Sequence, residues 1–320
     1  MNHTQQANQW LRRFRLDITS NSNRLYANGR QQVEVTITIE PREGQEITEQ
    51  QLSTLQLVLI DDDGHVRDLE GDLQARHLRD SRFDYHASGA TVPAALTQPS
   101  AGAMRRRFYV SSTLPGGSLS TIHAGIWRDE HTSFETNAAP FRSSVVIESV
   151  APPSPHESRF QLSVQDKVSY KLDNGSYWND EIEEEVAYFG FRDPNNRIVA
   201  SHAQATPSAE PFYVRNNWDH ALISFQLTND YSQHCRVAAY AVDQPFSLQL
   251  PDSSQTLTER PHHMTLYRHF SRFYRRWFND LNESTSLWTV LDRHGNAYTV
   301  EFLAGTGGNA LSFRLSDRHS

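Results

Sequence analysis

Cysteine is almost absent from this chain of 320 residues, because Cys235 is its single cysteine. One cysteine excludes an intrachain disulfide and a zinc site built from thiolates. The sequence therefore does not indicate a disulfide-stabilised scaffold or a zinc finger. We interpret Cys235 as a buried, inert thiol, because free cysteine is among the most buried residue types.

Long apolar runs are absent as well. Residues 1–6 read Met-Asn-His-Thr-Gln-Gln, which lacks the basic and apolar segments of a secretory signal. No run approaches the roughly 20 apolar residues that a membrane-spanning helix needs. We therefore expect no membrane span and synthesis in the cytoplasm, followed by retention there or release by a signal-less route or lysis.

The chain also lacks an excess of basic charge. It has 30 Lys and Arg against 38 Asp and Glu, which gives a formal net charge of −8. Binding to a nucleic-acid backbone needs a strongly basic surface, so nucleic acid is not the expected partner. Aromatic residues make up 11% of the chain, and a disordered chain would contain fewer.

Familiar catalytic motifs are missing, including the Gly-x-Ser-x-Gly elbow, His-Glu-x-x-His and the phosphate-binding glycine loops. Three clusters could still carry chemistry. Residues 61–65 could bind a hard cation, His262, His263 and His269 a transition metal, and the acidic run 180–185 a sugar. A hairpin turn, surface histidines and a solvated strand explain them more simply. We expect no enzyme, no metal and no cofactor.

Strand patterns dominate what is present. Residues 32–39 alternate strictly, with Val33, Val35, Ile37 and Ile39 on one face. Further strands are predicted at residues 14–18, 55–60, 108–110, 121–127 and 144–147.

Two segments of the first half interrupt the strand pattern. Residues 48–51 (Thr-Glu-Gln-Gln) have the form of a capping box and predict a short helical turn. Residues 87–103 are rich in Ala, Ser, Pro, Gly and Thr and predict a long loop.

The second half of the chain repeats landmarks of the first. Phe-x-Leu at residue 14 and Asn-Gly at residue 28 recur at one offset of 146 residues (160 minus 14, and 174 minus 28). Two looser matches follow, an acidic turn (61–64 and 193–196) and Phe-Tyr-Val (108–110 and 212–214). The proline-rich segment 151–156 precedes the second copy. We interpret the chain as residues 1–150, a linker at 151–156, and residues 157–320.

Residues 24–39 read Arg-Leu-Tyr-Ala-Asn-Gly-Arg-Gln-Gln-Val-Glu-Val-Thr-Ile-Thr-Ile. This segment resembles the opening of bacterial immunoglobulin-like domains of the invasin and intimin type, which place an Ala-Asn-Gly turn before a Val/Thr strand. The resemblance covers about 40 residues of the first copy. It implies a β-sandwich that serves as a spacer or adhesive module, with no catalytic residues. The predicted fold is mostly β: tandem immunoglobulin-like antiparallel sandwiches with one C-terminal amphipathic helix.

That helix is predicted at residues 261–281, where apolar and aromatic residues recur three or four positions apart. Its arginines and tryptophan form a candidate partner surface: Arg268, Arg272, Arg275, Arg276 and Trp277. Packing of the aromatic face on a sheet is the plainer alternative to docking an acidic partner. A hairpin of residues 287–291 and 297–302, and a last strand at 310–315, are predicted to follow.

The function expected from these features is non-enzymatic. The sequence favours a protein-interaction or self-assembly (structural) protein of bacterial or phage origin, with a protein partner or a second copy of itself. The alternative is a carbohydrate- or receptor-binding module of a toxin or injection particle. Tyr177, Trp178 and Trp218 are the candidate aromatic residues for that alternative.

Overall fold

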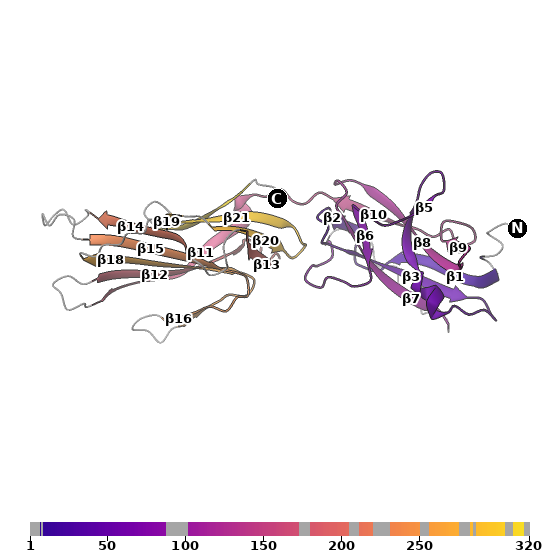
Figure 1. The fold of residues 1–320 in the computed structure, drawn as a ribbon, viewed down its shortest axis with the longest axis horizontal. Helices are drawn as coiled ribbons and strands as arrows, with labels where there is room; N and C mark the ends of the chain where they lie inside the picture. The colour runs from indigo at the N-terminus through magenta and orange to yellow at the C-terminus, as the bar shows by residue number, and fades with distance from the viewer. Residues whose placement is uncertain are drawn as a thin grey trace. The chain divides into compact units, whose positions relative to one another are not determined.

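The chain folds into two compact units in its computed structural model (Figure 1). The structure describes residues 7, 9–87, 102–172, 180–204, 211–219, 231–249, 256–274, 282–283, 286–304 and 310–316. The first unit comprises Met1–Pro153 and His294–Asn296, and the second comprises Ser154–Arg293 and Ala297–Ser320. The division between Pro153 and Ser154 falls within the proline-rich segment. Both units are mostly β.

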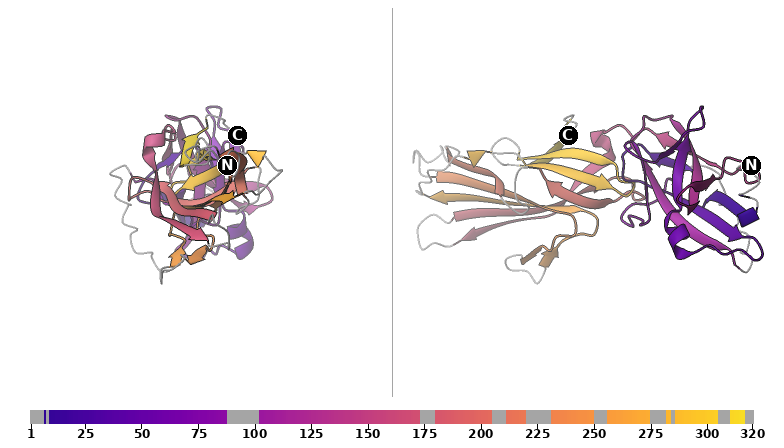
Figure 2. Two further views of the ribbon diagram at one scale, coloured as in Figure 1. Left: turned by 90° about the vertical axis from the view of Figure 1, so that its left-hand side faces the viewer. Right: turned by 45° about the vertical axis from the view of Figure 1, so that its right-hand side comes forward.

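Two sheets form the first unit (Figure 2). The four-stranded sheet has the order β1 (Leu11–Ile18), β3 (Val33–Pro41), β7 (Met104–Ser112), β6 (Leu73–Arg76). The six-stranded sheet has the order β2 (Arg24–Tyr26), β10 (Val145–Val150), β8 (Leu119–Asp129), β4 (Gln56–Ile60), β5 (Val66–Asp68), and β9 (Thr132–Glu135) also pairs with β8. The pair β2–β10 is parallel, and the others are antiparallel. The short helix α2 (Glu49–Ser53) precedes β4.

One hydrophobic core lies between these sheets. The alternation predicted for β3 is confirmed, because Val33, Val35, Ile37 and Ile39 are at most 1% exposed. They share one core with inward-facing residues of the six-stranded sheet, such as Ile122. Alternate residues of a strand point to opposite faces, so each sheet contributes one apolar face. The first unit is therefore a β-sandwich.

The Asn28-Gly29 turn joins β2 to β3. Gly29 has a φ of +68°, a conformation that glycine adopts without steric cost. The side-chain oxygen of Asn28 accepts hydrogen bonds from the backbone N–H groups of Arg30 and Gln31, both at 2.9 Å. Asparagine favours turns because its side chain bonds to nearby backbone in this way. The two residues thus fix the entry into β3.

Two sheets also form the second unit. The larger has the order β11 (Phe160–Leu172), β12 (Asp180–Phe191), β18 (Met264–Tyr274), β15 (Tyr231–Tyr240), β14 (Pro211–Asp219), β19 (Asn282–Glu283). The smaller has the order β13 (Ile198–Ala203), β20 (Ser286–Asp292), β21 (Ala297–Ala304), β22 (Leu311–Leu315). The 3-10 turn η1 (Glu157–Arg159) precedes β11. A core that includes Phe189, Leu266, Trp288 and Phe302 joins both sheets.

A two-stranded hairpin lies on the outer face of the larger sheet. It consists of β16 (Ser247–Gln249) and β17 (Thr256–Thr258), and Figure 1 shows β16 beside the sheet. Val186 and Tyr188 of β12 pack with Phe246 and Leu257 in a separate cluster. Figure 1 also shows β12, β18, β15 and β14 side by side. The larger sheet is thus covered on parts of both faces.

The predicted helix at residues 261–281 is wrong over Met264–Tyr274, which form the strand β18. β18 lies between β12 and β15 and pairs with both along its length. Met264, Leu266 and Phe270 face the core with a period of two, but Arg268 interrupts that apolar series. Tyr267 packs against the cluster on the other face. Because residues on both faces of β18 are buried, its apolar residues also fall at spacings that fit a helix. Residues 275–281 lie outside the described residues.

The predicted C-terminal hairpin and last strand are confirmed. β20 and β21 pair antiparallel, with Leu291 opposite Ala297 across the Gly295 turn. β22 then pairs with β21. Of the predicted long loop at 87–103, residues 88–101 lie outside the described residues.

Two of the four repeated landmarks lie at positions that are not equivalent in the two units. Phe14 and Phe160 are both buried on the first strand of their unit. By contrast, residues 61–64 connect β4 to β5 within one sheet, whereas 193–196 connect β12 to β13 in different sheets. Residues 108–110 lie in the third strand of their sheet and 212–214 in the fifth. Residues 174–175 are outside the described residues.

Candidate functional site

Arg268 is the one residue of the predicted partner surface whose side chain the structure describes. Arg268 lies in β18 and is 1% exposed, so it is a buried residue and not part of an exposed basic face. Arg272 is in β18, Trp218 in β14 and Cys235 in β15, but their side chains lie outside the described residues. Also outside them are five predicted residues: Tyr177, Trp178, Arg275, Arg276 and Trp277.

Arg268 is the centre of an ion-pair cluster with the acidic run of β12. Its guanidinium donates to Glu183 Oε2 at 2.9 Å and to Glu185 Oε2 at 3.1 and 3.2 Å. The cross-strand register places Glu185 directly opposite Arg268. Lys167 of β11 adds a second cation, 2.9 Å from Glu183. The predicted solvated face of this acidic run is therefore an internal charge network at Glu183 and Glu185.

Burial raises the pKa of the Glu183 carboxyl, but hydrogen bonds from Lys167 and Arg268 outweigh that effect and lower it overall. On the opposite face of β12, Glu184 accepts a hydrogen bond from the Tyr267 hydroxyl at 2.7 Å and lies 3.4 Å from His269 Nδ1. Every carboxylate in this cluster thus has a donor beside it. The cluster satisfies its own charges, as a structural network does.

The acidic turn at residues 61–65 brings three potential metal ligands together. Ligand atoms of Asp61, Asp63 and His65 lie within 4.8 Å of one another. Asp61, however, already accepts from the Arg67 guanidinium at 2.7 Å and from the backbone N–H groups of Asp63 and His65. The Arg67 hydrogen bond is the main reason that the pKa of Asp61 is lowered. These contacts are those of a hairpin turn between β4 and β5.

His262, His263 and His269, considered above as a possible metal site, do not form a group of three ligands in the part of the chain that the structure describes. His263 Nδ1 lies 2.8 Å from the carbonyl oxygen of Pro261, and His269 lies beside Glu184. The single group of three possible ligands found in that part of the chain is the acidic turn.

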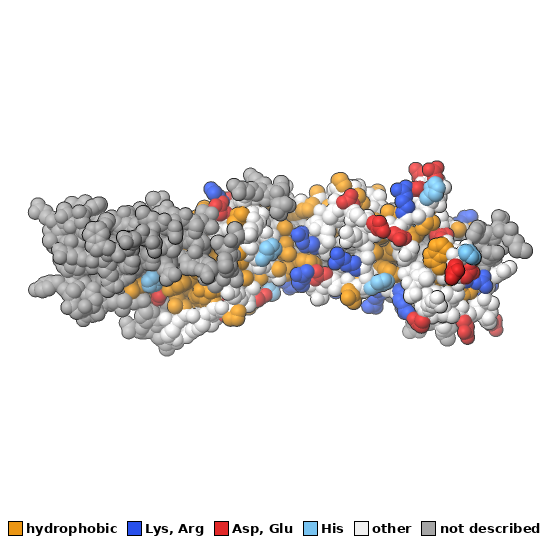
Figure 3. Space-filling view, in the orientation of Figure 1, with side chains coloured by type: hydrophobic (Ala, Val, Ile, Leu, Met, Phe, Trp, Pro, Cys, Tyr) orange, Lys and Arg blue, Asp and Glu red, His pale blue; other side chains and the backbone are white. Residues whose placement is uncertain are grey.

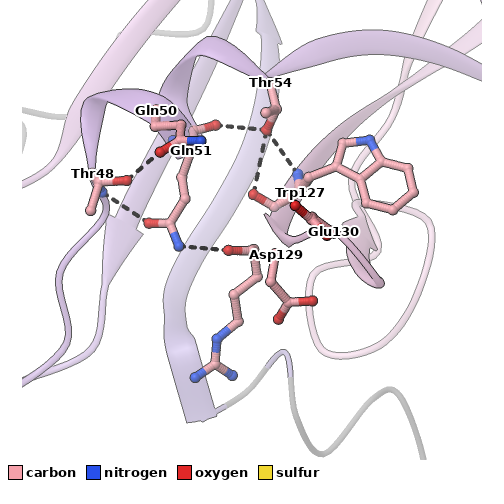
Figure 4. A pocket seen from close by; sticks show the side chains of 8 residues that line it. Thr48, Gln50, Gln51, Thr54, Trp127, Asp129 and Glu130 are labelled. Atoms are coloured by element: carbon pink, nitrogen blue, oxygen red, sulfur yellow. Dashed lines mark hydrogen bonds between the residues drawn. The ribbon is translucent and has the colours of Figure 1, made fainter.

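A pocket of about 600 Å³ lies in the first unit between α2 and the end of β8 (Figure 4). Thr48, Gln50, Gln51 and Thr54 form one side, and residues 127–130 form the other. The sequence forms α2 at this place because Thr48 and Gln51 make a complete capping box, as predicted. The Gln51 N–H donates to Thr48 Oγ1 at 3.2 Å, and Gln51 Oε1 accepts from the Thr48 N–H at 2.9 Å.

Hydrogen bonds fasten α2 to the end of β8. The Gln51 side-chain amide donates to the Arg128 carbonyl at 2.8 Å. The Trp127 N–H donates to Thr54 Oγ1 at 2.9 Å. Figure 4 shows these bonds crossing between the two elements, with the indole of Trp127 on the side away from α2. The two walls are therefore held at a fixed separation.

The lining of the pocket combines one exposed aromatic ring with hydroxyl, amide, guanidinium and carboxylate groups. Trp127 is 44% exposed. The Arg128 guanidinium carbon lies 5.8 Å from the centre of the Trp10 ring, which anchors that side chain on the core. The Asp129 carboxyl accepts from the His131 N–H at 3.0 Å, and this bond, followed by one from Thr132, lowers its pKa. Asp129 is therefore ionised at neutral pH.

Sequence reasoning missed this pocket. Its parts were found separately, as a helical turn at residues 48–51 and as a strand at 121–127. No spacing links two segments that lie more than 70 residues apart, so only their pairing in the fold shows that they form one site. The exposure of Trp127 could have been inferred from its parity on β8, because Ile122, Ala124 and Ile126 face the core.

No protein-family model matches this chain, and no curated protein matches it. Among the described residues, no helix has the length and apolar character needed to cross a membrane. The chain is thus a mostly β protein of two units, and its described residues include a Trp-bearing pocket with charged and polar groups.

Proposed function

We propose that this chain is a non-enzymatic protein-interaction or self-assembly protein built from tandem immunoglobulin-like sandwiches. The strand order of the first unit supports an immunoglobulin-like fold. That fold has one sheet in the order A-B-E-D and another in the order C-F-G. If β1, β3, β4, β6, β7, β8 and β10 are strands A to G, the observed orders β1-β3-β7-β6 and β10-β8-β4 match it. The resemblance of residues 24–39 to invasin-type domains supports the same assignment.

The second unit supports the tandem arrangement. Its larger sheet begins β11-β12-β18-β15, which corresponds to A-B-E-D, and its smaller sheet contains β13-β20-β21, which corresponds to C-F-G. β14 and β19 extend the larger sheet beyond this core, and β22 extends the smaller one. Spacer and adhesive modules use such sandwiches as rigid supports for contact surfaces.

The outer face of the six-stranded sheet in the first unit supports a role in protein contact. Six large hydrophobic side chains are exposed among the described residues, and four of them lie on this one face: Val66, Leu119, Trp127 and Val146. Scattered exposed apolar residues are normal, but a concentration on one face marks an interaction surface. This concentration is the observation on which the proposal rests.

Three of these side chains belong to an apolar stripe, which we define as Leu119, Val146, Ile60 and Val66. Val146 pairs with Thr121, and Leu119 lies two residues from Thr121 on β8. Ile60 pairs with Val66 across β4 and β5. β4 in turn pairs with β8, with Val58 opposite His123. The stripe therefore runs across four neighbouring strands.

The charges beside the stripe favour a second copy of the chain as the partner. On the β10 side, Arg24 and Glu148 form an ion pair at 3.0 Å. On the β5 side, Asp68 lies on the same face as Val66, whereas Arg67 points to the opposite face and pairs with Asp61. A twofold axis parallel to the strands would place the β10 side of one copy against the β5 side of the other. Val146 would then meet Val66, with the Arg24–Glu148 pair of one copy on the same side as Asp68 of the other. In Figure 3 charges of both signs are interspersed over the visible part of this unit.

Light scattering coupled to size exclusion tests the proposal. We expect the full chain at neutral pH to show a mass above that of a monomer, rising with concentration. The double variant Leu119→Glu, Val146→Glu should be monomeric, because charge burial opposes the contact. The control is Val164→Glu, an exposed valine of β11 in the second unit, which should leave the mass unchanged. A monomer at every concentration up to about 100 μM, well above the micromolar Kd of a weak specific contact, would contradict self-assembly.

The carbohydrate alternative has no support from the residues that suggested it. Tyr177 and Trp178 lie outside the described residues, and of Trp218 only the backbone is described. Protein contact is therefore the function that the described surface supports best.

A further inference from the structure

The pocket between α2 and the end of β8 has the properties of a small-molecule site. Ligand pockets have volumes of roughly 300–1,000 Å³ and carry a few convergent polar groups; this one measures about 600 Å³. We propose that it binds a neutral saccharide, with a sugar ring against the part of Trp127 that borders the pocket and its hydroxyl groups toward the polar groups of the lining. The proposal concerns this pocket alone and does not rest on self-association.

The chemistry of the lining favours a polyhydroxylated ligand. Hydroxyl groups donate and accept hydrogen bonds at once. The pocket offers acceptors in Asp129 and Glu130, donors in Arg128, and both in the amide of Gln50. An indole supplies a broad apolar face together with a polar N–H. Sugar rings need both types of surface, because their C–H groups form apolar patches between hydroxyls.

Other ligand classes fit the pocket less well. Two carboxylates against one guanidinium disfavour an anion such as a phosphate group. The charged groups of the lining disfavour an aliphatic ligand, since burying them without partners costs free energy. A cationic side chain could lie on Trp127 beside Asp129, but Arg128 places a like charge in the same pocket.

The pocket is also formed before any ligand arrives. The capping box fixes α2, and the bonds from Gln51 to Arg128 and from Trp127 to Thr54 fix α2 against β8. This bonding network does not include the side-chain amide of Gln50, a residue that lines the pocket. A preformed site loses little conformational entropy on binding, so shallow sugar contacts suffice for measurable affinity.

Binding to an array of neutral oligosaccharides tests this proposal. The probes are tri- and tetrasaccharides of glucose, N-acetylglucosamine, galactose and mannose, presented to the full-length chain. We expect binding to at least one series, competed by the same soluble sugar. Calorimetry with that sugar should show affinity about tenfold or more weaker in Trp127→Ala, as for the loss of a central aromatic contact. Gln50→Ala should also bind more weakly.

The matched control is Leu78→Ala, which removes another exposed apolar side chain from the same unit, outside both the pocket and the apolar stripe. It should bind like the unchanged chain. Far-UV circular dichroism checks the fold of each variant, and Gln50→Ala decides the matter if Trp127→Ala does not fold. The proposal is overturned by an array without hits, or by equal affinity in Trp127→Ala and Gln50→Ala. Trp127-dependent binding of an arginine-rich peptide, without sugar binding, would overturn it in favour of a cationic partner.

Discussion

The role of Arg268 in the fold differs from the role that its sequence pattern predicts. Read as part of a helix, it belonged to an exposed basic face. In the fold it is a buried charge held between Glu183 and Glu185. A buried ion is tolerated only with close partners and hydrogen bonds, because removal from water costs several kcal/mol. The acidic run of β12 and this arginine therefore form one feature, although the sequence separates them by more than 80 residues.

Replacement of Arg268 by alanine should destabilise the second unit by about 3–5 kcal/mol, because it leaves the buried Glu185 without its cation. Acidification should also lower the stability of the unchanged chain and of the Arg268→Ala variant by different amounts. The pKa of Glu183 is lowered in the folded state, so its stabilising effect is present above about pH 4.5, its ordinary pKa, and is lost as the pH falls through the folded value. Urea unfolding at pH 7 and pH 4 should show a smaller loss of stability on acidification in Arg268→Ala.

The control for this prediction is Arg314→Ala in the same unit. Arg314 also pairs with a glutamate, Glu301, but its side chain is largely exposed. The side chain of Glu301 is 14% exposed, but the arginine of this pair is solvated, so we expect the free energy of unfolding to fall by much less than in Arg268→Ala. Equal effects of the two substitutions would show that burial of Arg268 is not what makes its pair important.

At the scale of single elements, the short helix α2 depends on its cap. A helix of five residues has little stability of its own, since nucleation is costly. Thr48→Ala should therefore destabilise the first unit by about 1 kcal/mol, because the N–H of Gln51 loses its acceptor. Thermal unfolding followed by circular dichroism measures the effect.

Thr48→Ser is the matched variant, because serine keeps the capping hydroxyl. It should unfold close to the unchanged chain. A loss as large as that of Thr48→Ala would mean that packing of the threonine methyl group, and not the cap, supports α2.

The elements also show what the sequence could predict. Strict alternation predicted β3, and the capping box predicted α2, because both signals are local. The strand β18 was missed because its position between β12 and β15 buries residues on both faces and places Arg268 inside. The residue pattern within a strand does not show which other strands lie beside it in the sheet. The Trp127 pocket was missed for the same reason, since its two walls meet only in the fold.

At the scale of the whole molecule, each unit has its own core. The cluster that contains Val35 draws its residues from the first unit, and the cluster that contains Val300 draws them from the second. Domains that each bury a core of their own unfold as separate cooperative units. The proline-rich segment at the division cannot continue a sheet from one unit into the other.

Separate cores predict two separable unfolding transitions. Val35 and Val300 are both fully buried strand residues, so Val→Ala at either position should cost about 2–3 kcal/mol through lost apolar burial and a small cavity. Differential scanning calorimetry of the full chain should show Val35→Ala lowering one transition temperature and Val300→Ala lowering the other. The two substitutions serve as controls for each other, because chemistry and burial are the same. If either one lowered both transitions, the units would unfold as a single cooperative structure.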